Sequence, residues 1–269
     1  MGVNVGTVTD NDGNFSITSL NLADGSYELS VTATDASGNS SISSLPLLVT
    51  VDTAPPVTPS ITTTIAATKE TTPTIDGFAE PDSTVLLFIN GSNSGISTLS
   101  DSSTGAFSIT SSELEDGSYQ FTVKATDAAG NISAASDALS MTVDATAPTQ
   151  PAITTTTTLT SHSTPTIEGT AEAESTVELF NGAISLGTAK AGSDGSFSII
   201  SSQLPDNSYT LTVTATDALG NESDPSDELA ITIDTTAPST PSITTTTVLT
   251  NNPTPTIEGT AEAGSTVEL

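Results

Sequence analysis

Acidic residues recur at fixed places in this sequence, and they are its best candidates for chemistry. An aspartate follows valine or isoleucine in "VDTAP", "VDATAP" and "IDTTAP", a glutamate follows alanine in "AEPDS", "AEAES" and "AEAGS", and another aspartate opens "DASGN", "DAAGN" and "DALGN". These residues are Asp52, Asp144, Asp234, Glu80, Glu172, Glu262, Asp35, Asp127 and Asp217. Carboxylates on short loops are hard oxygen ligands, and with backbone carbonyls and water they suit Ca²⁺.

The charge balance points to the same partner. The chain has 32 acidic residues against 3 basic ones, which gives a formal charge of −29. Nothing here neutralises phosphates, so nucleic acid is excluded as an ordinary partner, and docking on anionic membranes is disfavoured. No apolar run approaches the roughly 20 residues that span a bilayer, so no membrane insertion is expected. A surface this acidic repels itself without cations, so we expect calcium ions as partners.

The acidic residues follow a repeat of domain size. "YELSVTATDASGN" at 27–39, "YQFTVKATDAAGN" at 119–131 and "YTLTVTATDALGN" at 209–221 are copies of one segment. Asp52, Asp144 and Asp234 lie 92 and 90 residues apart, as do the tyrosines of the copies. A period of about 90 residues is the length of a domain. We place complete repeats at 53–144 and 145–234, the C-terminal half of a repeat at 1–52 and the N-terminal half of one at 235–269.

Within a repeat the pattern is that of β-strands. In "YTLTVTATD", Tyr209, Leu211, Val213 and Ala215 alternate with threonine, which predicts a strand with one buried and one exposed face. Turn sequences separate similar short segments, and threonine runs at 62–64, 154–158 and 244–247 are expected on the first, edge strand. Seven strands in about 90 residues predict an all-β chain of tandem immunoglobulin-like β-sandwiches forming an elongated rod.

This fold would gather the acidic residues. The loops after the second and sixth strands of such a sandwich lie at the end where the chain enters. We therefore predict calcium sites at the domain junctions from three trios: Asp52, Glu80 and Asp127; Asp144, Glu172 and Asp217; and Asp234 and Glu262 with Asp35. The alternative is that these aspartates only cap turns and that "TDAxGN" is a tight hairpin. Repulsion among three carboxylates without a basic partner favours the metal.

The repeated motifs resemble those of a known family. "D-x-T-A-P-x-x-P-x-I", "P-T-I-x-G-x-A-E-x-x-S-T-V" and "A-T-D-A-x-G-N" are similar to the tandem Ig-like repeats of giant bacterial adhesins and biofilm-associated surface proteins. The resemblance covers the whole chain, and its motifs recur three times in register. It implies an extracellular stalk that projects an adhesive tip and is stiffened by Ca²⁺ bound between domains.

The two half-repeats are complementary, which predicts a partner. Residues 235–269 of one molecule would complete residues 1–52 of the next, because two rigid domains would hold the two halves of one molecule too far apart to meet. Such a head-to-tail contact does not close and generates a filament. The alternative, held equally, is that the sequence is a window of a longer repeat protein in which neighbouring sequence completes each half.

We therefore expect a non-enzymatic, extracellular or cell-surface structural protein, a stalk or filament supporting adhesion or biofilm matrix. The alternative is a binding module that recognises a glycan or a protein through its loops. An enzyme has little support, because the single histidine, His162, lies in a Ser/Thr-rich loop without a matching acid or nucleophile. The chain has no cysteine, so neither disulfides nor thiolate sites are available.

Overall fold

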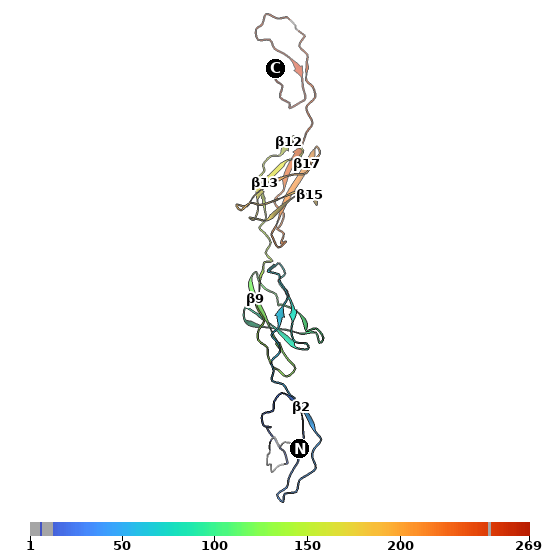
Figure 1. The fold of residues 1–269 in the computed structure, drawn as a ribbon. Helices are drawn as coiled ribbons and strands as arrows, with labels where there is room; N and C mark the ends of the chain where they lie inside the picture. The colour runs from blue at the N-terminus through green and yellow to red at the C-terminus, as the bar shows by residue number, and fades with distance from the viewer. Residues whose placement is uncertain (1–5, 7–12, 247–248) are drawn as a thin grey trace. The chain divides into compact units, whose positions relative to one another are not determined.

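The computed structural model describes residues 6, 13–246 and 249–269, and every helix or strand assigned in these residues is a strand (Figure 1). The part of the chain that it describes has no helix long and apolar enough to cross a membrane. The chain divides into two compact units, Met1–Ala145 and Thr146–Leu269.

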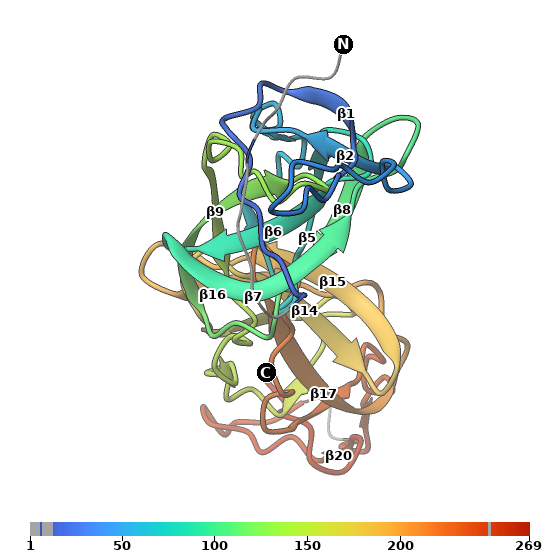
Figure 2. The same ribbon diagram turned by 90° about the horizontal axis from the view of Figure 1, so that it is seen from below.

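The first unit contains a complete two-sheet sandwich (Figure 2). Its smaller sheet has the order β3-β5-β8, formed by Ser60–Ile61, Thr74–Phe78 and Ala106–Thr110. Its larger sheet has the order β4-β10-β9-β6-β7, formed by Ala67–Thr68, Leu139–Val143, Gly117–Thr126, Thr84–Ile89 and Ser92–Leu99. All pairs are antiparallel except β4 with β10.

The second unit repeats this topology. Its smaller sheet has the order β11-β13-β16, formed by Ala152–Ile153, Thr166–Thr170 and Ser196–Ile200. Its larger sheet has the order β12-β18-β17-β14-β15, formed by Leu159–Thr160, Leu229–Ile233, Asn207–Thr216, Thr176–Asn181 and Ile184–Lys190. The fold of one complete repeat is therefore specified twice by two different sequences.

Alternation along the strands explains both cores. In β9, Phe121, Val123 and Ala125 are fully buried, while Thr122 and Lys124 between them are not. Because successive side chains of a strand point to opposite faces, one face of each sheet enters the core. In the second unit Leu211, Val213 and Ala215 are fully buried in the same way. The predicted all-β sandwich is confirmed.

The first strand of each repeat differs from the prediction. It is split into two short strands, β3 and β4 or β11 and β12, one in each sheet, so a complete repeat has eight strands instead of seven. The threonine runs 62–64 and 154–158 lie between these strands, not on an edge strand. There Thr63 Oγ1 accepts a hydrogen bond from the Asp76 amide at 2.8 Å, and Thr155 Oγ1 accepts one from the Glu168 amide at 2.7 Å. Threonine side chains thus hold the chain where it changes sheets.

A second feature without a sequence prediction is a serine-bonded segment beside β9. Ser133 donates its amide to the carbonyl of Ala125 at 2.9 Å, and its hydroxyl accepts the Ala125 amide at 2.9 Å. Ser136 makes the same pair of bonds with Val123, at 2.9 and 3.1 Å. Three residues of this segment therefore span the same distance as two residues of β9, so the two chains cannot form a regular ladder of backbone hydrogen bonds. The serine hydroxyls accept the strand amides that this mismatch would otherwise leave without an acceptor.

The remaining residues form two smaller segments. The N-terminal segment, residues 13–52, pairs β1 (Gly25–Leu29) with β2 (Leu47–Val51) in the register of β9 with β10. The C-terminal segment, residues 235–246 and 249–269, pairs β19 (Ser242–Ile243) with β20 (Gly259–Thr260) as β3 pairs with β5. Both segments expose apolar side chains whose counterparts in the complete repeats are buried.

Candidate metal site at the acidic loops

The "TDAxGN" loop is built around its own aspartate. Asp127 Oδ1 accepts the amide of Asn131 at 2.8 Å, and Oδ2 accepts the side-chain amide of Asn131 at 2.9 Å. The side-chain hydrogen bond from Asn131 lowers the pKa of Asp127, and burial opposes this shift. Asp35 with Asn39 and Asp217 with Asn221 repeat the arrangement. The aspartate therefore shapes the loop as a turn, whether or not a metal binds.

Asn131 also joins this loop to the junction before the repeat. Its side-chain amide donates to the main-chain carbonyl of Asp52 at 3.0 Å. The carboxylate of Asp52 accepts the amide of Ala54 at 3.0 Å. Asn131 thus links the loop of Asp127 to the main chain of Asp52, two predicted residues of the first trio, while the carboxylate of Asp52 bonds elsewhere.

The glutamate of this trio is fixed by a tight turn. The Ser83 hydroxyl donates to the Glu80 carbonyl at 2.6 Å, and the Ser83 amide donates to the same oxygen at 3.2 Å. The turn places Asp82 at a φ of 60°, in the left-handed region that favours glycine. The carboxylate of Glu80 accepts the amide of Val57 at 3.3 Å. Glu80 therefore reaches the same linker, five residues beyond Asp52.

The residues of the other two trios are divided between the two units. Glu262 lies with Asp234 in the second unit and accepts the amide of Ser239 at 3.0 Å, as Glu80 does from Val57. Asp35 belongs to the first unit. In the middle trio Asp144 belongs to the first unit, and Glu172 and Asp217 belong to the second.

The structure adds an acidic residue that sequence analysis missed. Asp24 Oδ1 accepts the amide of Thr53 at 3.1 Å and its hydroxyl at 2.8 Å, directly beside Asp52. Asp116 accepts the Ala145 amide at 2.8 Å, and Asp206 accepts the Thr235 amide at 3.0 Å. The available sequence signal is the repetition of "ADGSY", "EDGSY" and "PDNSY" in register. Taken alone, each of these segments indicates only a turn.

The donor chemistry fits a hard cation, because carboxylate and main-chain oxygens are the groups available at these loops. Within the residues that the structure describes, however, no three acidic or histidine side chains are gathered closely enough to hold an ion. The carboxylates of Asp52, Glu80 and Asp127 instead accept hydrogen bonds from amide groups. Calcium binding by the predicted residues therefore stays a prediction.

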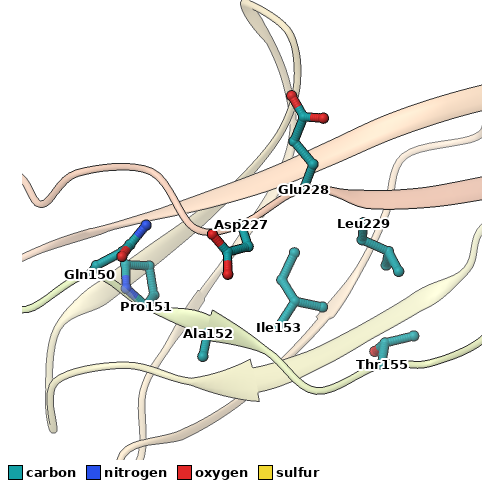
Figure 3. A pocket seen from close by; sticks show the side chains of 8 residues that line it. All are labelled: Gln150, Pro151, Ala152, Ile153, Thr155, Asp227, Glu228 and Leu229. Carbon is teal, nitrogen blue, oxygen red and sulfur yellow. The ribbon is translucent and has the colours of Figure 1, made fainter.

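The second unit has a shallow hollow (Figure 3). Its volume is about 260 Å³, and it lies between β11 and the chain that leads into β18. Ile153 and Leu229 form apolar walls, Asp227 supplies a carboxylate, and the side chain of Gln150 is held by a 2.7 Å bond to the carbonyl of Pro225. The hollow contains neither a histidine nor a lysine. His162 lies elsewhere, exposed, with its ring 3.2 Å from the Thr160 hydroxyl.

The antiparallel two-sheet sandwich with a split first strand, present twice in tandem, is the architecture of immunoglobulin-like domains. The chain belongs to the bacterial Ig-like domain family, whose model matches residues 1–53, 61–145 and 148–235. The fold and the family predicted from the sequence are both confirmed.

Individual relatives are more distant. Chitinase A1 of Niallia circulans is 36% identical over 152 residues, which cover 53% of this chain and 20% of that protein, so the chain spans a small part of that relative. The BSP domain of a biofilm-associated protein is 20% identical, covers 67% of this chain and 30% of its own, and has a TM-score of 0.28. The D0-D1 domain of Intimin is 14% identical, with 65% and 97% covered and a TM-score of 0.24.

Proposed function

We propose that this chain is a non-enzymatic structural segment of a bacterial surface protein, a stalk of tandem Ig-like domains that supports adhesion or biofilm matrix. The observation that carries the proposal is the tandem repetition of one fold with matching linkers. Asp24 accepts the amide of Thr53 at 3.1 Å, and Asp206 accepts the amide of Thr235 at 3.0 Å. The backbone after the last strand of each of these repeats is therefore held by the same hydrogen bond. The names of a biofilm-associated protein and of Intimin among its structural neighbours agree with this role.

Calcium at the junctions would stiffen the stalk. The linker after Asp52 already meets Asn131 and Glu80 of the following repeat, at 3.0 and 3.3 Å. A bound Ca²⁺ would supply positive charge to loops that carry carboxylates and no lysine, and so lower the repulsion in a chain of formal charge −29. Asp52, Glu80 and Asp127 are the residues that would hold it.

Small-angle scattering and electron microscopy of the full chain, with calcium and with chelator, test this proposal. Calcium should extend and stiffen the particles and raise the melting temperature. Asp127→Asn should reduce the change, whereas Glu113→Gln, an exposed acidic residue away from the trios, should not. Identical scattering curves and melting temperatures with and without calcium would contradict the stiffening.

Head-to-tail pairing of the terminal segments is the second part of the proposal. Their apolar side chains are exposed where the complete repeats bury the equivalent residues, so pairing would remove that surface from water. A heterologous contact of this kind propagates into a filament. Polymers in electron micrographs that disappear on deletion of residues 235–269 are the expected result.

A glycan- or protein-binding module is the competing function, and the hollow beside Gln150 is the observation that favours it. The first complete repeat has Thr58 and Ala138 where the second has Gln150 and Glu228, so the two repeats differ there. A glycan array probed with the full chain distinguishes the functions. A specific signal that Gln150→Ala abolishes would favour the binding module over the stalk.

A further inference from the structure

The hollow of the second unit combines apolar walls with a carboxylate. Figure 3 shows the Asp227 carboxylate directed toward Gln150, whereas the Glu228 carboxylate points away from the hollow. Ile153 and Leu229 are half-buried, so part of each apolar side chain stays open to a ligand. The lining contains no basic residue, so the charge of Asp227 is not neutralised within the hollow.

The walls of the hollow belong to fixed parts of the fold. Ser226, next to Asp227, donates its amide to the Val213 carbonyl at 2.9 Å, and its hydroxyl accepts the Val213 amide at 3.1 Å. Leu229 begins β18, and Ile153 ends β11. Side chains on such fixed elements lose little conformational freedom when a ligand binds.

Two oxygen acceptors at this hollow have no donor. Within the part of the chain that the structure describes, no hydrogen bond or ion pair reaches the carboxylate of Asp227. The side-chain nitrogen of Gln150 donates to the Pro225 carbonyl at 2.7 Å, which leaves the side-chain oxygen Oε1 as a second acceptor. Acceptors that include a carboxylate favour a ligand that donates hydrogen bonds and carries positive charge.

We propose that this hollow binds a lysine or arginine side chain of a partner protein. The aliphatic stem lies against Ile153 and Leu229, and the cationic head binds the Asp227 carboxylate and Gln150 Oε1. The volume of about 260 Å³ is below the range of about 300–1,000 Å³ found for pockets that take drug-sized ligands, so it suits a single side chain. The site requires only the fold of the second unit, so it is independent of calcium binding and of head-to-tail pairing.

Charge and shape together select this kind of occupant. A chain of formal charge −29 attracts cationic segments and repels anionic ones. The chain itself is a poor source of the ligand, because it has 3 basic residues, of which Lys124 already lies over Phe88 and Lys190 pairs with Glu174. The lining has no aromatic ring on which a sugar could stack. A basic segment of another protein is therefore the occupant that the hollow fits.

The first complete repeat has only part of this arrangement. Asp137 corresponds to Asp227, but Thr58 stands in the place of Gln150. Threonine has no amide group to make the bond that Gln150 makes to the Pro225 carbonyl. We therefore expect no binding at the first repeat, which makes Asp137→Asn the matched control for Asp227→Asn.

The first test is an NMR titration of the full chain with N-acetyl-lysine amide and, in parallel, N-acetyl-arginine amide. The methyl signals of Ile153 and Leu229 should shift and saturate, with the millimolar dissociation constant expected for one side chain. Asp227→Asn should weaken binding about fivefold, the upper end for an exposed ion pair. Asp137→Asn and Glu228→Gln each remove one exposed negative charge and should bind as wild type does. Equal losses from all three variants would show diffuse attraction to an acidic surface and would overturn the site.

The second test separates the stem of the ligand from its charge. N-acetyl-norleucine amide has the aliphatic stem without the ammonium group, and methylammonium has the charge without the stem. Neither should saturate the signals of Ile153 and Leu229 at concentrations where the lysine amide does. Gln150→Thr, which introduces the residue of the first repeat, should weaken binding of the lysine amide. Norleucine amide binding as tightly as the lysine amide would contradict the role of Asp227.

A third set of ligands distinguishes the occupants. The peptide acetyl-Gly-Lys-Gly amide should bind at least as tightly as the lysine amide. Tighter binding of cadaverine would make the hollow a site for a free diamine, and saturable shifts from glucose alone would make it a sugar site. Either result overturns the partner protein as occupant. If no ligand gives a saturable shift, the site itself is wrong, while the proposed stalk, tested by scattering and microscopy, is untouched.

Discussion

The side-chain amide of Asn131 donates a hydrogen bond to the main-chain carbonyl of Asp52, 79 residues earlier, at 3.0 Å. The same amide group donates to the Asp127 carboxylate at 2.9 Å. One asparagine therefore ties the loop after β9 to the residue at which the preceding segment ends. This hydrogen bond is one link of the first junction, together with the bond from the Val57 amide to Glu80.

Replacing Asn131 should loosen that junction. Asn131→Ala removes the two side-chain bonds, and at about 0.5–1.5 kcal/mol per bond the free energy of unfolding should fall by about 1–3 kcal/mol. Thermal and urea unfolding of the full chain measure the loss. Asn39→Ala is the matched control, because Asn39 makes the equivalent bond to Asp35 in the N-terminal segment. Equal losses from both variants would mean that the bond to Asp52 contributes nothing.

The serine-bonded segment should be sensitive at Ser133. Its hydroxyl accepts the amide of the fully buried Ala125 at 2.9 Å and donates to the carbonyl of Ala134 at 2.8 Å. Ser133→Ala leaves that buried amide without its side-chain acceptor, which costs about 1–3 kcal/mol. Urea unfolding should show a lower midpoint for Ser133→Ala and an unchanged one for the exposed control Ser112→Ala. An unchanged midpoint for both would show that water replaces the hydroxyl.

The turn that fixes Glu80 should improve with glycine at position 82. Asp82 has a φ of 60°, and the corresponding residue of the C-terminal segment is Gly264, with a φ of 87°. Asp82→Gly relieves the left-handed strain and should raise the free energy of unfolding by about 0.5–1 kcal/mol. The same change at Asp137, which is not among the residues with positive φ, should lower it. A lower melting temperature for Asp82→Gly would show that the turn holds no strain.

Acid should weaken the loop around Asp101. Its Oδ1 atom accepts bonds from the hydroxyls and amides of Ser103 and Thr104 at 2.7–3.0 Å, and these bonds hold the pKa of Asp101 far below its usual value. Since the folded pKa is depressed, the stabilisation is complete above the unfolded pKa of about 3.9 and is lost as the pH falls below it. Asp101→Asn should therefore destabilise the chain at pH 7, and its deficit should shrink by pH 2.5. Urea unfolding at both pH values measures this, and a deficit independent of pH would contradict it.

The sequence predicted the β-strands because their signal is local. Alternation in "YTLTVTATD" requires only that successive side chains face opposite sides, and Leu211, Val213 and Ala215 are buried as that period demands. The split first strand was not predictable in this way. It depends on which sheet offers a free edge and on threonines such as Thr63 that bond to a neighbouring strand.

The candidate site shows the same division. Composition and repeated spacing singled out Asp52, Glu80 and Asp127 as oxygen donors, because residue types and periods are written in the chain. The bonds of Asn131 to the Asp52 carbonyl and of Asp24 to Thr53 became visible only in three dimensions, since these partners lie 79 and 29 residues away in sequence.

What the sequence by itself determined was the repeat, the all-β sandwich, the family and the acidic character of the linkers, all of which follow from local pattern and period. What only the tertiary structure decided was how distant backbones meet. Gly77 is one more small residue in the sequence, and the need for glycine there appears only when the Ser60 carbonyl of β3 and the Phe107 ring of β8 both lie against it. Close packing between strands depends on the shapes of both partners, which a one-dimensional pattern does not contain.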